Sequence, residues 1–62
     1  MTKGKDLRKE RIRASVSQID MAKCMNVSQQ YVSRVELSKY VNRKVAAKFR
    51  AAITELSNHK QS

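Results

Sequence analysis

Proline is absent from this chain, and its only glycine, Gly4, lies close to the N-terminus. These two residues interrupt regular backbone most readily, so long stretches of helix can run between short turns. Strands would require alternating runs of β-branched and aromatic residues, and no such run is long enough to form one. The sequence therefore predicts an all-α fold.

The chain has 62 residues, which is enough for one domain. A domain of this size buries only about 60% of the surface that its unfolded chain exposes, which leaves little room for a catalytic pocket. The five carboxylates, one histidine and one cysteine are scattered, so they form no catalytic or metal-ligating group. We expect a protein that is not an enzyme and needs no metal or other cofactor.

Cys24 is the only cysteine, so an intramolecular disulfide is impossible. A lone thiol and a basic, polar N-terminal segment in place of a signal peptide are typical of the reducing cytoplasm. No apolar run approaches the roughly 18 residues needed to span a membrane. We therefore expect a cytoplasmic protein with no membrane partner and a partly exposed thiol.

Two helices are expected in the first part of the chain. Asp6 can cap a helix over about residues 6–14, with Leu7 and Ile12 as its clearest apolar contacts. Ser17 begins a Ser-x-x-acid sequence, so it can cap a second helix that starts at the next residue. Both predictions depend on a side-chain oxygen that accepts a backbone hydrogen bond at the helix start.

Two more helices are expected in the second part of the chain. Ser28 can cap a helix that runs to Leu37, and Asn42 can cap a fourth. From Val45 to Leu56 apolar residues recur with helical spacing, the clearest such pattern in the sequence.

Both ends of the chain are polar. Residues 1–5 are expected to be frayed and residues 57–62 to form a flexible tail. A compact domain of four helices, or five at most, is predicted between them, over residues 6–56.

Fourteen Lys and Arg residues stand against five Asp and Glu residues, which gives a formal net charge of +9. On a small domain this charge produces a positive field that attracts polyanions. Nucleic acid is the commonest such partner, an anionic membrane surface is the next, and a merely solvated surface is the plain alternative. Charge alone does not choose among them.

The stretch SQIDMAKCMNVSQQYVSRVE, residues 17–36, predicts two short helices joined by a three-residue turn. Ala22 supplies a small side chain where two such helices come closest, and Asn26 can adopt the left-handed conformation that ends the first helix sharply. Val32 and Val35 give the second helix an apolar inner face. This stretch resembles the lambdoid repressor and Cro-type (XRE-like) helix-turn-helix family.

The resemblance extends more weakly over residues 7–53 and implies a lambda-repressor-like fold with a helix-turn-helix over about residues 17–37. It implies that the helix over about residues 28–37 is a recognition helix in the DNA major groove. The positions that contact bases in the family correspond to Gln29, Gln30, Ser33 and Arg34. Those that contact phosphates correspond to Ser17, Gln18, Ser28, Tyr31, Lys39, Tyr40, Asn42 and Arg43. The plain alternative for both glutamines is a solvent-facing polar side chain.

In the same family an Arg of the first helix pairs with a Glu at the end of the third. Arg11 and Glu36 occupy the matching places, so the resemblance implies an internal ion pair that holds one helix against the other. Three turn positions at which the family often has Gly are Ser15, Asn26 and Ser38 here. Asn26 is an easy substitute, whereas each serine implies strain or a different turn.

The sequence predicts a sequence-specific DNA-binding regulator, Cro- or repressor-like and of the kind found in phages and mobile elements. It would be a homodimer at least on DNA, because one such module makes few contacts. The alternative is a small modulator that binds a repressor or other regulatory protein. Its candidate surface consists of apolar residues outside the expected core, Ile19, Leu37, Tyr40 and Val41.

Overall fold

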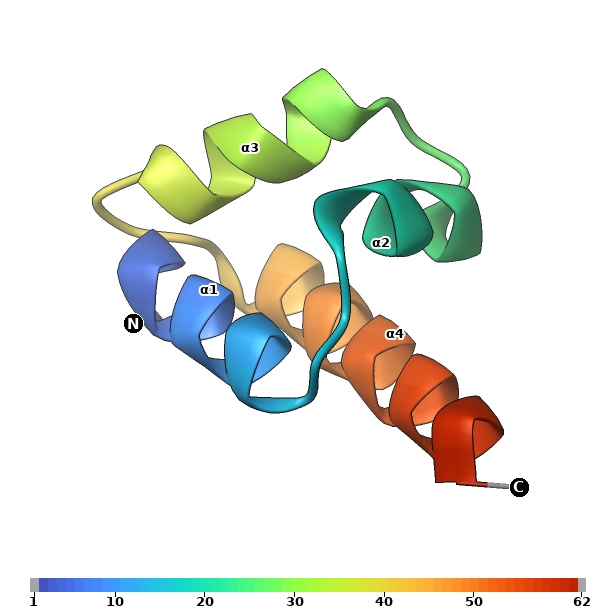
Figure 1. Ribbon diagram of the computed structural model, residues 1–62. Helices are drawn as coiled ribbons and strands as arrows, with labels where there is room; N and C mark the ends of the chain where they lie inside the picture. The colour runs from blue at the N-terminus through green and yellow to red at the C-terminus, as the bar shows by residue number, and fades with distance from the viewer. Residues whose placement is uncertain (1, 62) are drawn as a thin grey trace.

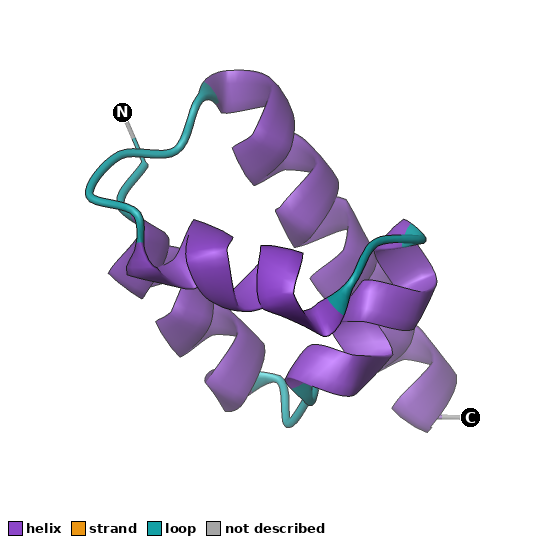
Figure 2. Cartoon of the chain, turned by 90° about the horizontal axis from the view of Figure 1, so that it is seen from above, coloured by secondary structure: helices purple, strands orange, loops and turns teal. Residues whose placement is uncertain are grey.

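Four helices account for most of the structure, a computed structural model that describes the backbone of residues 2–61 and the side chains of residues 2–58. They are α1 (Gly4–Arg13), α2 (Gln18–Met25), α3 (Gln29–Leu37) and α4 (Arg43–Gln61). Short loops join them, and the described residues form no strand beyond one isolated bridge (Figures 1 and 2). The predicted all-α fold of four helices is confirmed. No helix in this part of the chain is long and apolar enough to cross a bilayer.

Three of the predicted caps are present. Ser17 Oγ accepts a hydrogen bond from the Asp20 N–H at 3.0 Å, and Ser28 Oγ accepts one from the Tyr31 N–H at 3.1 Å. At the start of α4, Asn42 Oδ1 accepts from the Val45 N–H at 2.8 Å. Each cap satisfies an orphan backbone donor and contributes about 1 kcal/mol to helix stability.

The N-terminus differs from the prediction. Helix α1 begins at Gly4, with Lys3 as its cap residue, so Asp6 lies inside the first turn and is not the cap. Residues 2–5 are not frayed, because Thr2 bridges Val41, whose N–H donates to the Thr2 carbonyl at 2.7 Å. The Gly4 N–H donates to the Ser38 carbonyl at 3.0 Å. Met1 lies outside the described residues.

Helix α4 also runs further than predicted. It continues past Leu56 to Gln61, so the tail expected over residues 57–62 is helical as far as the structure describes it. No glycine or proline follows Leu56, so no residue there forces the helix to end. Ser62 and the side chains of residues 59–61 lie outside the described part of the chain.

The core lies between all four helices. Its largest fully buried side chains are Phe49, Leu7, Met21, Val16 and Val32. A fully buried side chain of this kind contributes about 1.5–3 kcal/mol relative to an exposed one. These five residues therefore form the centre of the core.

The predicted burial of two apolar residues was wrong. Ile12, expected in the core, is 51% exposed, because it lies on the side of α1 away from the other helices. Val41, expected on an exposed apolar surface, is 5% exposed, because the bridge to Thr2 draws it inward. Val41 therefore leaves the candidate partner surface.

The helices form a closed ring of contacts in the order α1, α3, α2, α4. In Figure 1, α3 lies above α1, with α2 beside it and α4 below. This arrangement covers the inner face of α3 and leaves its outer face to solvent.

Candidate nucleic-acid interface

The outer face of α3 carries the predicted base-contacting residues. Gln29, Gln30 and Arg34 are exposed, and Ser33 is partly buried. Gln30, Ser33 and Arg34 line one shallow hollow together with Leu37. Three of the four predicted residues therefore lie side by side on one surface.

The turn between α2 and α3 sets the direction of α3. Asn26 has φ 57° and ψ 47°, the left-handed conformation predicted for it. Its N–H donates to the Lys23 carbonyl at 3.3 Å, and the next N–H, of Val27, donates to the Ala22 carbonyl at 2.9 Å. These bonds close the end of α2, so α3 begins after a turn of only three residues.

The two serine turns differ from each other. Ser15 has φ 59°, so it adopts the left-handed conformation that glycine would adopt without strain. Ser38 has φ −68° and ψ 139°, which is extended backbone that any residue accepts. The chain therefore leaves α3 by a different turn, as the serine at this position suggested.

The predicted ion pair between Arg11 and Glu36 is present and buried. Arg11 Nε donates to Glu36 Oε2 at 2.6 Å, and Arg11 Nη2 donates to Glu36 Oε1 at 3.1 Å. Arg11 Nη1 also donates to the Val16 carbonyl at 2.7 Å. The two side chains are 10% and 1% exposed. This paired geometry fixes the end of α3 against α1.

Gln18 extends this contact to α2. Its Nε2 donates to Glu36 Oε1 at 3.0 Å, and its side chain is partly buried. One carboxylate, Glu36, therefore holds α1 and α2 behind α3. Gln18 thus ties the start of α2 to the end of α3.

The predicted phosphate-contacting residues are spread over several surfaces. Ser17, Ser28 and Asn42 are exposed at helix starts, where their side-chain oxygens form the caps. Exposed helix N-termini favour phosphate because their backbone N–H groups point outward.

The predicted phosphate-contacting residues around the start of α4 divide into two groups. Lys39 and Tyr40 line a hollow with Lys3 and Lys5, beside the end of α3. Arg43 lies in another hollow, with Arg50. Lys3 and Lys5 were missed because residues 1–5 were expected to be frayed.

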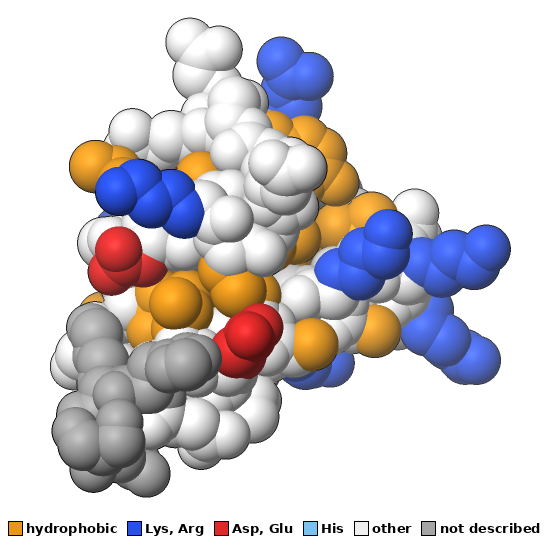
Figure 3. Space-filling view, turned by 90° about the vertical axis from the view of Figure 1, so that its right-hand side faces the viewer, with side chains coloured by type: hydrophobic (Ala, Val, Ile, Leu, Met, Phe, Trp, Pro, Cys, Tyr) orange, Lys and Arg blue, Asp and Glu red, His pale blue; other side chains and the backbone are white. Residues whose placement is uncertain are grey.

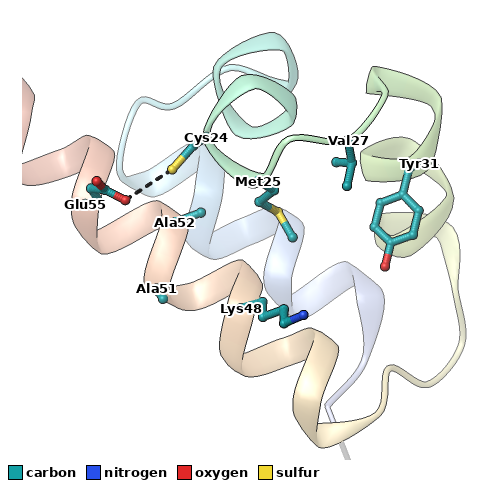
Figure 4. Close-up of a pocket in the computed structure, with 8 residues that line it drawn as sticks. All are labelled: Cys24, Met25, Val27, Tyr31, Lys48, Ala51, Ala52 and Glu55. Carbon is teal, nitrogen blue, oxygen red and sulfur yellow. Dashed lines mark hydrogen bonds between the residues drawn. The ribbon is translucent and has the colours of Figure 1, made fainter.

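Tyr31 lies apart from the other α3 residues. It lines a groove with Cys24, Met25 and Val27, and residues of α4 form the opposite wall (Figure 4). On the side of the molecule where α2 and the end of α4 lie, hydrophobic side chains gather at the centre of the surface, with Lys and Arg mainly at one edge (Figure 3). Tyr31 is thus better placed for this groove than for the face that carries Gln30.

The thiol at the edge of this groove is partly buried, as expected. Cys24 Sγ donates a hydrogen bond to Glu55 Oε2 at 3.4 Å. Partial burial raises the pKa of Cys24, and the hydrogen bond and negative charge of Glu55 raise it further. The neutral thiol is therefore favoured over the reactive thiolate.

No protein-family model matches this sequence, and no curated protein or solved structure matches it at a significant level.

Proposed function

We propose that the chain is a sequence-specific DNA-binding regulator in which α2 and α3 form a helix-turn-helix and α3 enters the major groove. The observation that carries this proposal is the outer face of α3. It presents Gln29, Gln30 and Arg34 to solvent, while the buried contact between Arg11 and Glu36 holds the helix from behind. Rigid support of this kind is what a base-contacting helix requires.

The side chains on this face suit base edges. A glutamine amide can donate and accept at once, which matches N6 and N7 of adenine. Arg34, one turn beyond Gln30, carries a guanidinium fork that matches O6 and N7 of guanine. The proposed site therefore combines adenine and guanine contacts on neighbouring base pairs.

Phosphate contacts would orient the domain on the duplex. The starts of α2 and α4 supply exposed backbone donors, and Lys39 and Arg43 supply charge beside α4. A single helix of this length contacts few base pairs, so we propose a homodimer on DNA with half-sites about one helical turn apart.

A mobility-shift titration tests the proposal after bound sequences are selected from a random DNA pool. Gln30→Ala should weaken binding to the selected site by about 1–3 kcal/mol and relax the preference at one base pair. Lys23→Gln is the matched control, because Lys23 is an exposed polar residue of α2 outside the proposed interface.

Three outcomes would contradict the proposal. One is a pool that yields no enriched sequence, and another is a Gln30→Ala variant with an unchanged base preference. Equal weakening by both variants on all sequences would reduce the chain to a non-specific DNA binder.

A second candidate function is supported by exposed apolar residues at the end of α3. Leu37 is 82% exposed and Tyr40 is 56% exposed, and both line the hollow that contains Lys39. Ile19, also 51% exposed, lies on α2. These residues suit a protein partner, either a second copy or another regulatory protein. Leu37→Ser should then weaken association of the free protein in sedimentation.

A further inference from the structure

The net charge of the chain lies outside the two helices proposed to contact bases. Residues 17–37 contain two cations, Lys23 and Arg34, and two carboxylates, Asp20 and Glu36, so their formal net charge is zero. The whole net charge of +9 is therefore carried by the flanking segments, which hold α1 and α4. Attraction to a polyanion must come mainly from these two helices.

On α1 the cations form a regular row. Lys5, Lys9 and Arg13 follow one another at intervals of four residues, and all three are exposed. We call these three residues the α1 row. The carboxylates of α1 lie off it, and one of them, Glu10, pairs with Arg50 of α4 at 3.0 Å. Asp6 lies three residues before Lys9, and Glu10 lies three residues before Arg13, so the row is positive and is bordered by two carboxylates.

This arrangement does not serve the stability of the helix. Like charges four residues apart destabilise a helix by about 0.2–0.5 kcal/mol per pair. A cation in the first turn, as at Lys5, also opposes the helix dipole. The carboxylates of Asp6 and Glu10, each three residues from a cation of the row, and the place of Arg13 in the last turn offset these costs, so helix stability neither requires nor forbids the row.

Lys9 and Arg13 of the α1 row face away from α3, whereas Lys5 lines the hollow beside the end of α3. Gly4 and Arg11 mark the side of α1 that faces α3, because Gly4 lies against the carbonyl groups at the end of α3 and Arg11 pairs with Glu36. At about 100° per residue, Lys9 and Arg13 each lie about 160° around the helix from Arg11. Lys9 and Arg13 thus lie nearly opposite α3 across the thickness of α1.

We propose that the α1 row binds the phosphate backbone of a second DNA duplex, so that one chain joins two DNA segments. The row is about 12 Å long, a length over which one DNA strand carries three or four phosphates at about 3.4 Å per nucleotide. Contact with the second duplex is electrostatic and independent of sequence. A straight duplex seated on α3 lies on the opposite side of α1 from Lys9 and Arg13.

Binding of DNA by the α1 row does not depend on the proposed function. The joining of a specific DNA site to a second duplex does rest on the proposed function, because α3 would supply the specific contact. A capture experiment tests the surface with the full chain. A duplex with the selected sequence is fixed to beads, and a labelled duplex of unrelated sequence is added with the protein. The wild-type chain should hold the labelled duplex on the beads.

The informative variant is Lys9→Gln/Arg13→Gln, which removes two charges from the row. Capture of the labelled duplex should fall at least fivefold. The slope of log capture against log salt concentration should become less steep by about two, because two phosphate contacts are lost. Binding of the selected duplex alone should fall much less. The matched control, Lys23→Gln/Lys48→Gln, removes two exposed cations from α2 and α4 and should preserve capture.

A third variant separates the two proposals. Gln30→Ala/Arg34→Ala should lose preference for the selected sequence but keep the α1 surface, so it still binds a labelled duplex without sequence preference. If the wild type has no sequence preference yet Lys9→Gln/Arg13→Gln still lowers DNA binding more than the control does, the α1 surface stands and the proposed function fails.

Other results would overturn the α1 proposal. These are equal capture by the row variant and the wild type, equal loss in the row variant and the control, and no capture by a wild type that binds the selected duplex. Binding to phosphatidylserine vesicles that depends on the row, with capture unchanged, would assign the row to a membrane surface instead. Thermal unfolding by circular dichroism checks that the exposed substitutions leave the fold intact.

Discussion

Glu10 and Arg11 are neighbours on α1, and each ties that helix to a different partner. Arg11 pairs with Glu36 of α3 at 2.6 Å, and both side chains are at most 10% exposed. Glu10 pairs with Arg50 of α4 at 3.0 Å, and those side chains are 39% and 49% exposed. Each is an Arg–Glu pair with more than one hydrogen bond. The two pairs therefore differ mainly in how far their side chains are buried.

Burial decides what each pair does for the protein. In water the charges of Glu10 and Arg50 are nearly as well solvated apart as together, so such a pair stabilises by about 0–1 kcal/mol. Arg11 and Glu36 are buried, so water cannot solvate either charge in place of its partner. The loss of one partner therefore leaves the other charged and buried. The first contact adds little to the fold, whereas the second fixes the position of the helix proposed to contact DNA.

The largest effect is expected from Glu36→Leu, which leaves Arg11 buried without its carboxylate. The substitution should cost about 3–5 kcal/mol. A domain of this length is stable by only about 3–9 kcal/mol, so the variant should be partly or wholly unfolded at 25 °C. Urea titration followed by circular dichroism measures the loss.

The double variant Arg11→Met/Glu36→Leu is the control for this loss. It removes both charges, so much of the stability should return. If Glu36→Leu lost less than 1 kcal/mol, the burial argument would be wrong.

A smaller effect is expected from Gln18→Ala, which removes one of the donors to Glu36. The loss should be about 1–2 kcal/mol, because the carboxylate keeps both bonds from Arg11. Gln29→Ala, at an exposed position of α3, should change stability by less than about 0.5 kcal/mol. Equal urea midpoints for these two variants would show that Gln18 does not support α3.

Glu10→Gln should have a still smaller effect, about 0.2–1 kcal/mol at low salt. The difference from wild type should disappear near 1 M NaCl, because salt screens exposed charges. Unfolding titrations at the two salt concentrations measure this. A loss above 2 kcal/mol that survives high salt would place the exposed pair in the same class as the buried one.

The smallest effect on folding is expected at the contact between Glu55 and Cys24, where a carboxylate meets a neutral donor. Because the pKa of Cys24 is raised, its thiolate fraction at pH 8 is smaller than that of a free cysteine, and alkylation by iodoacetamide should be slower. Glu55→Gln lowers this pKa toward its ordinary value and should speed alkylation with little change in stability. Glu10→Gln is the control, and an equal increase in rate for both variants would contradict the assignment to Glu55.

Local signals made much of the fold predictable. The caps at Ser17, Ser28 and Asn42 and the left-handed Asn26 depend on residues within three or four positions, so the sequence contains all that determines them. The ion pair between Arg11 and Glu36 joins residues 25 positions apart, and only the family resemblance predicted it.

Features that depend on packing between distant segments were not predictable. Ile12 and Val41 are both β-branched; Ile12 is exposed because of the side of α1 that it occupies, and Val41 is buried where the loop after α3 meets Thr2. The exposure of Gln29, Gln30 and Arg34 followed from helical periodicity in α3, and only the resemblance gave these residues a role in contacting bases. The division of the cations between Lys39 and Arg43 did not follow from periodicity, because it depends on the path of the chain between α3 and α4.

Gly4 has a consequence for how the protein can change. A Cβ at this position would lie within 2.8 Å of the carbonyl oxygens of Val35, Glu36 and Ser38, although the backbone there is of a kind that any residue adopts. Every nucleotide change in a glycine codon that alters the amino acid adds a Cβ. Position 4 is thus closed to point mutation, whereas the left-handed positions Ser15 and Asn26 have a backbone that glycine adopts without strain. The chain has its one glycine where no other residue fits, and its sequence can drift at the turns.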